Sequence, residues 1–399
     1  MSHEPRPAGR IQEVFVAFLL LGLTSFGGPI AHLGYFRTEF VERRRWLSEQ
    51  AYSQLVALCQ FLPGPASSQV GFAIGLMRAG PWGAAAGWLA FTLPSAIVLV
   101  LFALGAAALD GPIGQGIIHG LKVTAVAIVA HAVWGMARSL CPDPQRAGIA
   151  LAAVFTVVLL SGPLSQMAAI AIGALAGMAL CRTHTESDMQ ALPLPVSARA
   201  GHLAGLAFVT LLIGLPLLAW TTPSATVAVM DAFYRAGALV FGGGHVVLPL
   251  LEAEVVQNGW VSTDEFLTGY GAAQAVPGPM FTFAAYLGAL MGPLGGGIFG
   301  AILALMMIFL PGMLLLVAVL PHWNQFRRWD RAHALMRGAS AAVVGILGAA
   351  LYHPAWTGAI LGPHEFVLAL TGFLLLSVWK LPAWAVVVIL AGGGILITI

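Results

Sequence analysis

Residues 60–65 read Gln-Phe-Leu-Pro-Gly-Pro, and residues 274–279 read Gln-Ala-Val-Pro-Gly-Pro. Each motif interrupts an apolar stretch, 48–79 and 262–292, that is too long for one straight membrane helix. Because proline lacks a backbone donor and glycine permits unusual dihedral angles, each motif predicts a broken helix. At membrane depth, such a break is tolerated only inside protein or beside a water-filled cavity.

The two motifs belong to a longer internal repeat. Phe26-Gly27-Gly28 recurs as Phe241-Gly242-Gly243, and Trp46-Leu47-Ser48 recurs as Trp260-Val261-Ser262. The offset is 215 residues for the first pair (241 − 26) and 214 for the second (260 − 46), so one residue is deleted in the intervening loop. This register predicts two homologous halves, and paired broken segments in two halves are typical of secondary transporters.

The composition indicates a protein whose solvent is lipid. Hydrophobic residues make up 59% of the chain and charged residues 9%, against about 25% charged residues in a soluble domain. The mean hydropathy is +0.89. The net charge of +2 gives no reason to expect nucleic acid as a partner. The cysteines Cys59, Cys141 and Cys181 predict neither a disulfide framework nor a zinc site.

The apolar stretches predict an all-α, polytopic transmembrane protein of about 13 segments. We expect a first transmembrane repeat at 1–182, a polar linker plus a connecting transmembrane helix at 183–225, and a second repeat at 226–399. The broken segments either cross the membrane or re-enter as hairpins. The predicted unbroken spans are 11–33, 82–108, 114–139, 145–161, 164–181, 203–220, 228–250, 295–320, 334–353, 365–379 and 381–398.

Charge in equivalent loops predicts that the two repeats are inverted. The loop after the first span is basic, whereas its repeat partner is acidic. Because positive charge marks cytoplasmic loops, equivalent loops of opposite charge are expected on opposite sides of the membrane. The basic residues are Arg37, Arg43, Arg44 and Arg45, and the acidic ones are Glu252, Glu254, Asp264 and Glu265.

The broken segments are the predicted binding site for an anion. A half-helix that starts after a break presents free N–H groups and the positive end of its dipole. The candidate substrate-binding residues are Gly27, Gly28, Gln60, Pro63, Gly64, Pro65, Ser67, Ser68, Lys122, Gly242, Gly243, Gln274, Pro277, Gly278, Pro279 and Thr282.

Several of these residues have a second interpretation. Gln60 and Gln274 point at the substrate or cap the broken backbone. Lys122, the only lysine well inside an apolar run, is an anion partner or extends its side chain to the interface. His32 and His245 are candidates for carrying a coupling proton or meeting a dianion. Arg43, Arg44 and Arg45 either collect the anion at the mouth or only set the topology.

The motifs resemble the chromate transporter family in its long, two-domain form. The resemblance rests on Ser25-Phe26-Gly27-Gly28-Pro29 with His32, Arg43-Arg44-Arg45-Trp46-Leu47-Ser48, Leu62-Pro63-Gly64-Pro65, Phe241-Gly242-Gly243-Gly244-His245 and Gln274-Ala275-Val276-Pro277-Gly278-Pro279. It implies a multi-pass bacterial inner-membrane protein that exports chromate and confers chromate resistance, with homologous halves in antiparallel topology.

This function is physically consistent with the sequence. The membrane potential drives a dianion outward by about 4.6 kcal/mol per 100 mV, so an exporter needs no nucleotide-binding motif, and proton coupling is an alternative. The sequence has no cofactor, metal or catalytic motif, so we do not expect an enzyme. Transport of another oxyanion such as sulfate and an anion channel are the alternatives. The expected partners are the oxyanion and the lipid bilayer, and a homodimer is left open.

Overall fold

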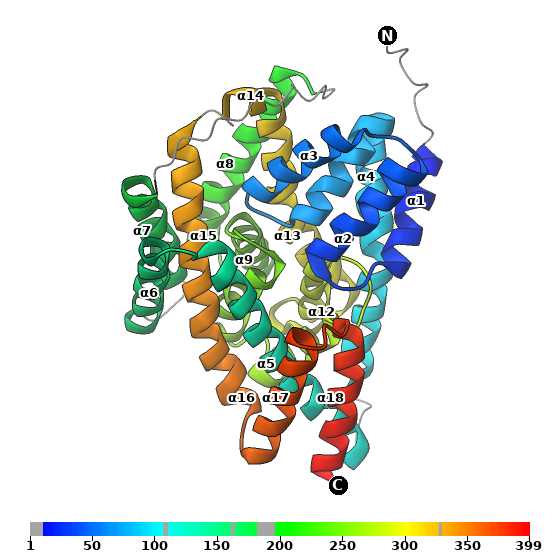
Figure 1. The fold of residues 1–399 in the computed structure, drawn as a ribbon, viewed down its shortest axis with the longest axis vertical. Helices are drawn as coiled ribbons and strands as arrows, with labels where there is room; N and C mark the ends of the chain where they lie inside the picture. The colour runs from blue at the N-terminus through cyan, green and yellow to red at the C-terminus, as the bar shows by residue number, and fades with distance from the viewer. Residues whose placement is uncertain (1–10, 107–110, 161–163, 182–195, 327–328) are drawn as a thin grey trace.

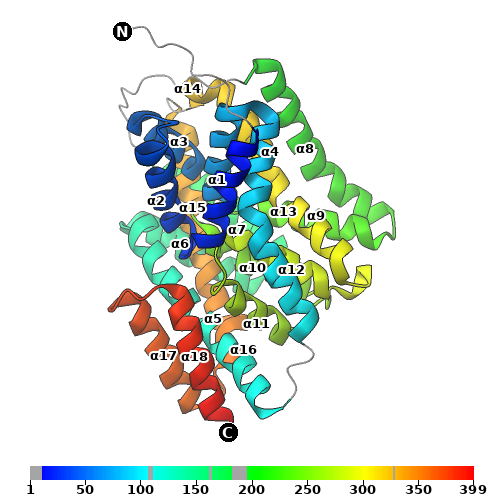
Figure 2. The same ribbon diagram turned by 90° about the vertical axis from the view of Figure 1, so that its right-hand side faces the viewer.

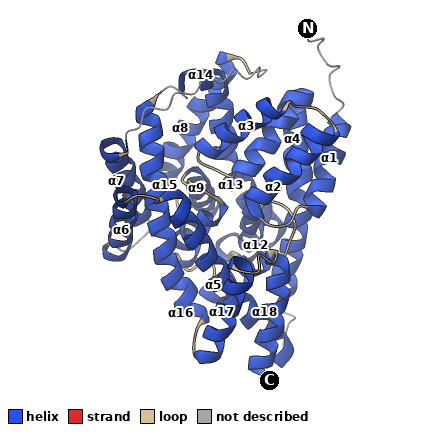
Figure 3. Cartoon of the chain, in the orientation of Figure 1, coloured by secondary structure: helices blue, strands red, loops and turns tan. Residues whose placement is uncertain are grey.

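The computed structural model describes residues 11–106, 111–160, 164–181, 196–326 and 329–399, and every regular element in these ranges is helical (Figures 1 and 3). Five helices of this part are long and apolar enough to cross a membrane. They confirm the polytopic transmembrane helical fold. The helix in the predicted connecting region is α8 (Ala198–Thr221), whereas the polar linker before it lies largely outside the described residues. The domain boundaries stay a prediction.

The first half begins with two helical hairpins. α1 (Ile11–Thr24) reverses at Gly27-Gly28 and returns as α2 (Gly28–Arg37), which continues into a π-helix at Thr38–Arg43. α3 (Glu49–Phe61) reverses at the Pro-Gly-Pro motif and returns as the first part of α4 (Ala66–Gly105).

Ion pairs hold the open ends of these two hairpins together. Glu13 of α1 pairs with Arg78 of α4 at 3.0 Å, and Arg37 of α2 pairs with Glu49 of α3 at 2.8 Å. The four helix ends therefore lie at one end of the molecule (Figure 1). With 13 residues, α3 is about 20 Å long. The 48–79 segment is therefore a re-entrant hairpin and not a crossing.

α4 itself turns back at Ala79-Gly80, where the backbone leaves the helical region. Gly80 has φ 68°, which favours glycine. The two arms pack so closely that a Cβ on Gly75 would be 2.5 Å from the carbonyl oxygen of Gly83. Residues 81–105 then run the full length expected of a membrane span.

The second half repeats both hairpins. α9 (Ala225–Ala238) reverses at Gly242-Gly243 and returns through a 3₁₀ turn (Gly244–Val246), α10 (Val247–Leu251) and a π-helix (Glu252–Val256). α11 (Thr263–Ala273) returns through a 3₁₀ turn (Met280–Thr282) as α12 (Phe283–Leu290).

Contacts between the arms show that these segments are hairpins as well. Arg235 of α9 pairs with Glu254 at 2.8 Å, and the Tyr286 hydroxyl of α12 donates to the carbonyl oxygen of Glu265 in α11. The stretches 11–33 and 228–250, which the sequence predicts as single spans, are therefore helix–break–helix units. Their apolar composition hides the Gly-Gly reversal.

The remaining helices complete the two repeats. The first half ends with α5 (Pro112–Leu140), α6 (Pro144–Leu159) and α7 (Leu164–Leu180). The second half continues with α13 (Gly297–Val319), α14 (Trp323–Phe326), α15 (Asp330–Ala350), a π-helix (Leu351–Trp356), α16 (Thr357–Ala359), α17 (Pro363–Ser377) and α18 (Ala383–Thr398), with short 3₁₀ turns at Gly292–Leu294 and Leu320–His322.

The last helices of each half pack on the other half. α17 and α18 pack on α5, whereas α6 and α7 pack on α15. Glycines permit both contacts: a Cβ on Gly120 of α5 would clash with the backbone of α18, and a Cβ on Gly338 of α15 would clash with the backbone of α7. α3 and α14 lie at one end of the molecule, and α16 and the end of α18 lie at the other (Figures 1 and 2). The predicted inverted repeats are confirmed.

Candidate functional site

The tips of the four hairpins meet in the middle of the molecule. The Gly64 N–H donates to the carbonyl oxygen of Val240 at 2.8 Å, and the Gly278 N–H donates to the carbonyl oxygen of Ser25 at 2.9 Å. The two bonds are equivalent in the repeat, because 278 − 64 is 214 and 240 − 25 is 215. Each Pro-Gly-Pro tip of one half is thus bound to the Gly-Gly reversal of the other.

These contacts explain why the tips need glycine. Gly64 and Gly278 have φ of 117° and 106°, and they lie against Gly312 and Ser95 respectively. A side chain at either position would be strained, and a Cβ on Gly278 would also lie 2.8 Å from the Ser95 hydroxyl. The N–H groups of both glycines join the halves, so they are not the free donors that the sequence predicts for a ligand.

Side chains that follow the two breaks also stabilise the broken backbone, one of them (Thr282) a predicted site residue and the other (Gln69) not. The Gln69 amide donates to the carbonyl oxygens of Pro63 and Gly312, at 3.0 and 2.9 Å. The Thr282 hydroxyl donates to the carbonyl oxygen of Pro279 at 2.7 Å. Pro65 precedes the first turn of α4. Gln274 has a buried side-chain nitrogen with no hydrogen-bond partner among the described residues.

A cavity of about 130 Å³ lies beside the tips, between the end of α3 and the first half of α15. A site for one water needs about 10–15 Å³ of such volume, so the cavity can hold several waters or a small oxyanion. Of the predicted residues, it contains Gln60 and Gly242. Its lining residues are Gln60, Phe61, Leu62, Leu140, Arg146, Phe241, Gly242, His333, Met336, Arg337 and Ser340.

The lining of this cavity is cationic. Arg146 stands at the start of α6 and is paired with Asp143 at 2.7 Å. Hydrogen bonds from the Arg146 backbone and side chain hold the pKa of Asp143, which lies in the α5–α6 connection, below its usual range. Arg337 of α15 donates to the carbonyl oxygen of Cys181 at 3.3 Å. Two guanidinium groups and the His333 ring therefore face a cavity that contains one of the two Gly-Gly reversals.

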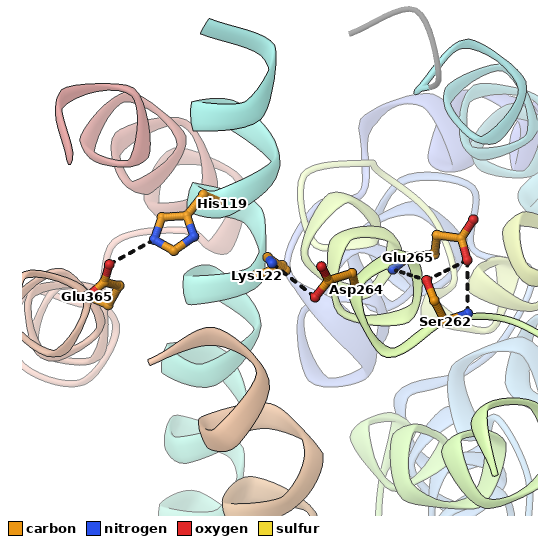
Figure 4. A network of polar contacts seen from close by, with 6 residues as sticks. All are labelled: His119, Lys122, Ser262, Asp264, Glu265 and Glu365. Carbon is orange, nitrogen blue, oxygen red and sulfur yellow. Dashed lines mark hydrogen bonds and ion pairs between the residues drawn. The ribbon is translucent and has the colours of Figure 1, made fainter. Parts of the chain in front are cut away.

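The equivalent place in the other half is filled by a histidine–glutamate contact and a lysine–aspartate ion pair (Figure 4). His119 and Glu365 are 3.3 Å apart, and Lys122 and Asp264 are 3.0 Å apart. Next to them, the Ser262 hydroxyl donates to Glu265 at 2.6 Å and caps α11. We call His119, Lys122, Asp264 and Glu365 the ion-pair belt.

The repeat relates the belt to the cavity residue by residue. Arg337 corresponds to His119 (337 − 119 = 218), and Ser340 corresponds to Lys122 (340 − 122 = 218). Arg146 corresponds to Glu365, because both are the third residue of helices that begin with proline. Lys122 therefore lies in the belt, with its side chain 12% exposed, and not in the cavity lining.

The two histidines occupy different surroundings. His32 is buried, and its Nδ1 lies 3.4 Å from the Ser67 hydroxyl. The Ser68 hydroxyl, which the sequence also predicts as a ligand, is buried without a partner among the described residues. His245 contacts the Tyr270 hydroxyl through Nδ1 at 2.9 Å.

The predicted arginine cluster lies at the open end of the first-half hairpins. Arg43 and Arg44 both pair with Glu39, and Arg44 lies 5.4 Å above the Trp46 ring. Arg45 follows in a left-handed conformation, with φ 53°. None of these three arginines lines the cavity.

Sequence reasoning missed Arg146, His333 and Arg337 as cavity residues. Arg146 lies in the first turn of α6, and His333 and Arg337 lie in the first two to three turns of α15. Arginine near the start of an apolar helix is usually a topology signal. Extending the repeat from the hairpins to α5 and α15 would have paired Arg337 with His119 and shown that both halves carry polar groups there. The same extension pairs the buried Glu39 with the buried Glu254 (254 − 39 = 215).

The chain was compared with known proteins. The model of the chromate transporter family matches residues 12–178 and 227–397. A probable chromate transport protein of Synechococcus elongatus is 29% identical, covering 98% of this chain and 96% of its own. Chromate transport proteins of Pseudomonas aeruginosa and Cupriavidus metallidurans are 26% and 27% identical, covering 96% and 94% of this chain and 90% of their own. No solved structure matches. The two matched blocks cover both halves, so the chain belongs to the chromate transporter family.

Proposed function

We propose that this protein is a secondary transporter that exports chromate from the cytoplasm across the bacterial inner membrane and so confers chromate resistance. The family and the names of the relatives support chromate as the substrate. A transporter of this kind needs no catalytic residue, cofactor or metal, and an enzymatic activity is not part of the proposed function. A homodimer stays a prediction.

The observation that carries this proposal is the cationic cavity at the meeting point of the hairpin tips. Chromate is a tetrahedral dianion, which favours several donors and positive charge around it. Arg146 and Arg337 supply two guanidinium groups, which bind oxyanions in a planar, two-pronged geometry. Gln60 and Ser340 add uncharged polar groups to the lining. We assign the substrate-binding role to this cavity and to the tips that border it.

The charge at the two ends supports the direction of transport. The first-half hairpins end in a basic cluster with Arg37, Arg43, Arg44 and Arg78, whereas the second-half hairpins end in Glu252, Glu254, Asp264 and Glu265. By the positive-inside rule the first-half end is cytoplasmic. The cavity is also lined by the first half of α15, beside the tips of the hairpins, and we infer that it loads from the cytoplasm.

The membrane potential is the simplest driving force. A dianion that leaves the negative interior gains about 4.6 kcal/mol per 100 mV, which corresponds to about three decades of concentration. A proton gradient through His32 or His245 is the alternative, and it stays a prediction.

The test is uptake of radiolabelled chromate into inverted membrane vesicles that contain the protein, under an imposed interior-positive potential. We expect saturable, potential-driven accumulation with weak competition from sulfate. Strong competition by sulfate would identify a general oxyanion transporter. Uptake that never saturates would identify an anion channel. Vesicles without any chromate accumulation would refute the proposed substrate.

A further inference from the structure

A second polar cluster lies next to the hairpin tips, and none of its residues lines the cavity. Ser25, at the first Gly-Gly reversal, is 0% exposed, and His32 of α2 is 1% exposed. The His32 ring lies 3.4 Å from the Ser67 hydroxyl at the start of α4. Ser95, on the other arm of α4, closes the cluster against Gly278, whose N–H donates to the Ser25 carbonyl oxygen. We call Ser25, His32, Ser67 and Ser95 the occluded cluster.

Several polar atoms in and next to this cluster have no partner among the described residues. They are the Ser25 hydroxyl and the hydroxyls of Ser68 and Thr92, which lie one and three residues along the chain from Ser67 and Ser95. His32 Nε2 has no side-chain partner there either, although the His32 ring interacts with the Ser25 backbone. Buried polar groups are normally hydrogen-bonded, because losing water without a replacement is costly. We take a ligand as the partner of the unpaired groups of the cluster.

The second half shows that the fold does not need polar groups here. Ser25 corresponds to Val240 and His32 to Val247, at an offset of 215, and Ser67 corresponds to Phe281, at an offset of 214. These three apolar residues are buried too, at 1%, 0% and 2% exposure. The same hairpins therefore pack with valine and phenylalanine in one half and with hydroxyls and imidazole in the other. The difference points to function.

The occluded cluster lies at the N-terminus of α4, which favours a negatively charged ligand. The first arm of α4 begins at Ala66, after Pro65, so the N–H groups of its first turn have no acceptor within the helix. These N–H groups and the positive end of the dipole favour an anion. Ser67 stands in this turn, and its hydroxyl contacts His32.

We propose that the occluded cluster binds one tetrahedral oxyanion through uncharged donors, Ser25, His32, Ser67 and the N-terminus of α4, as a second site behind the cationic cavity. The inference rests on the proposed function and deepens it, because it names where the dehydrated substrate is held. Donors without formal charge can take an anion from the arginines and release it, whereas a second cationic site would trap it.

The experiment compares the double variant Ser25→Ala/Ser67→Ala with the wild type by equilibrium binding of radiolabelled chromate to purified protein. Each lost hydrogen bond to an anion weakens binding substantially, so we expect the Kd to rise about tenfold or more. The control is Thr268→Val, which removes a buried hydroxyl on α11 that also has no partner among the described residues. We expect the control to bind as the wild type does.

Thermal unfolding separates a ligand site from a structural role. Removing the unpaired Ser25 hydroxyl and the long 3.4 Å contact between Ser67 and His32 should change the Tm of the ligand-free double variant little. The Tm increase that chromate causes should be smaller than in the wild type, because only the cationic cavity still binds the anion. A double variant with wild-type Kd and wild-type Tm increase would overturn the second site and leave the transporter proposal intact. A wild type that binds neither chromate nor sulfate would overturn both.

Discussion

α3 and α11 are the same element in the two halves, yet they pack differently. Both end at a Pro-Gly-Pro motif, and one face of each contains equivalent residues at an offset of 214. On α3, Ser53 and Ala57 are exposed, whereas on α11, Leu267 and Gly271 are buried. α11 lies so close to α5 that a Cβ on Gly271 would clash with the carbonyl oxygen of Leu121. The α11 hairpin therefore packs directly against α5, whereas the equivalent face of α3 is exposed.

The charges follow the same difference. Between α3 and α15 there is a cavity that Arg146 and Arg337 line. Between α11 and α5, which are in contact, the equivalent residues are Glu365 and His119, and these two side chains contact each other. A fold with inverted repeats can exchange two such packings, and the exchange moves the opening from one end to the other. The repeat relates the two packings but not their charges: in the described parts of the chain, two arginines line the cavity beside α3, whereas a histidine and a glutamate occupy the equivalent positions beside α11.

The largest effect on chromate uptake is expected from removing the two arginines that line the cavity beside α3. In the double variant Arg146→Gln/Arg337→Gln, chromate uptake by inverted vesicles should fall about a hundredfold. The reason is that two cations near a dianion are lost, and a hundredfold corresponds to about 2.8 kcal/mol.

The matched control is Arg138→Gln, because Arg138 is exposed near the end of α5 and stacks on Trp134. It should keep more than half of the wild-type uptake. Equal losses in both variants would assign the arginines to membrane topology and remove the cavity from the pathway.

The second prediction tests whether the close packing of α11 on α5 matters for transport. Gly271→Ala places a Cβ against the Leu121 backbone, so α11 has to withdraw from α5, and overpacking of this kind costs about 1–3 kcal/mol. We expect about tenfold lower chromate uptake. The counterpart variant Ala57→Gly, on the exposed face of α3, should change uptake less than twofold. If both variants behave alike, the difference between α3 and α11 has no role in transport.

The third effect concerns the ion-pair belt. Because Asp264 is 68% exposed, its pair with Lys122 is screened and contributes about 1 kcal/mol or less. Lys122→Ala should therefore lower uptake only about threefold to fivefold, and Lys122→Arg should retain more of it.

A charge swap decides what Lys122 does. If the residue holds α5 and α11 together, Lys122→Asp/Asp264→Lys recovers most of the uptake that Lys122→Ala loses. If it is an anion partner, the swapped variant is inactive and Asp264→Asn behaves as the wild type. The two outcomes distinguish a closing contact from a substrate contact.

The repeat, the inverted halves and the helix breaks could be predicted from the sequence. Pro-Gly-Pro and Gly-Gly recur at the same spacing in both halves, and each motif has a known effect on a helix. The sequence did not show that Gly64 and Gly278 bind the reversals of the opposite half. That contact joins residues 176 positions apart for Gly64 (240 − 64) and 253 positions apart for Gly278 (278 − 25), and it depends on how the halves are placed. Local pattern carries no information about such pairing.

The charged residues were harder still to interpret. An arginine at the start of an apolar helix has the same sequence signature whether it faces headgroups or lines a cavity, as Arg146 does. Lys122 was recognised as unusual, but its partner Asp264 lies 142 residues away in the other half. Equivalent positions such as Ser25 and Val240 have a polar residue in one half and an apolar residue in the other. This difference indicates a function only because the structure shows that both residues are buried.

The smallest effect tests whether the basic end of the first half also collects substrate. Arg43 is 72% exposed and pairs with Glu39 at 3.1 Å, so its charge is largely compensated and screened. Arg43→Gln should lower the rate of chromate uptake at most about twofold at low ionic strength, where the Debye length is about 30 Å, and not at all in 1 M salt, where it is about 3 Å. A salt-dependent loss would assign Arg43 to long-range attraction of the anion, which acts on the rate of encounter and not on the site. A loss that persists in high salt would mean that the charge at the open end of the hairpins acts on their movement. The difference between the halves would then extend from the tips to the surface.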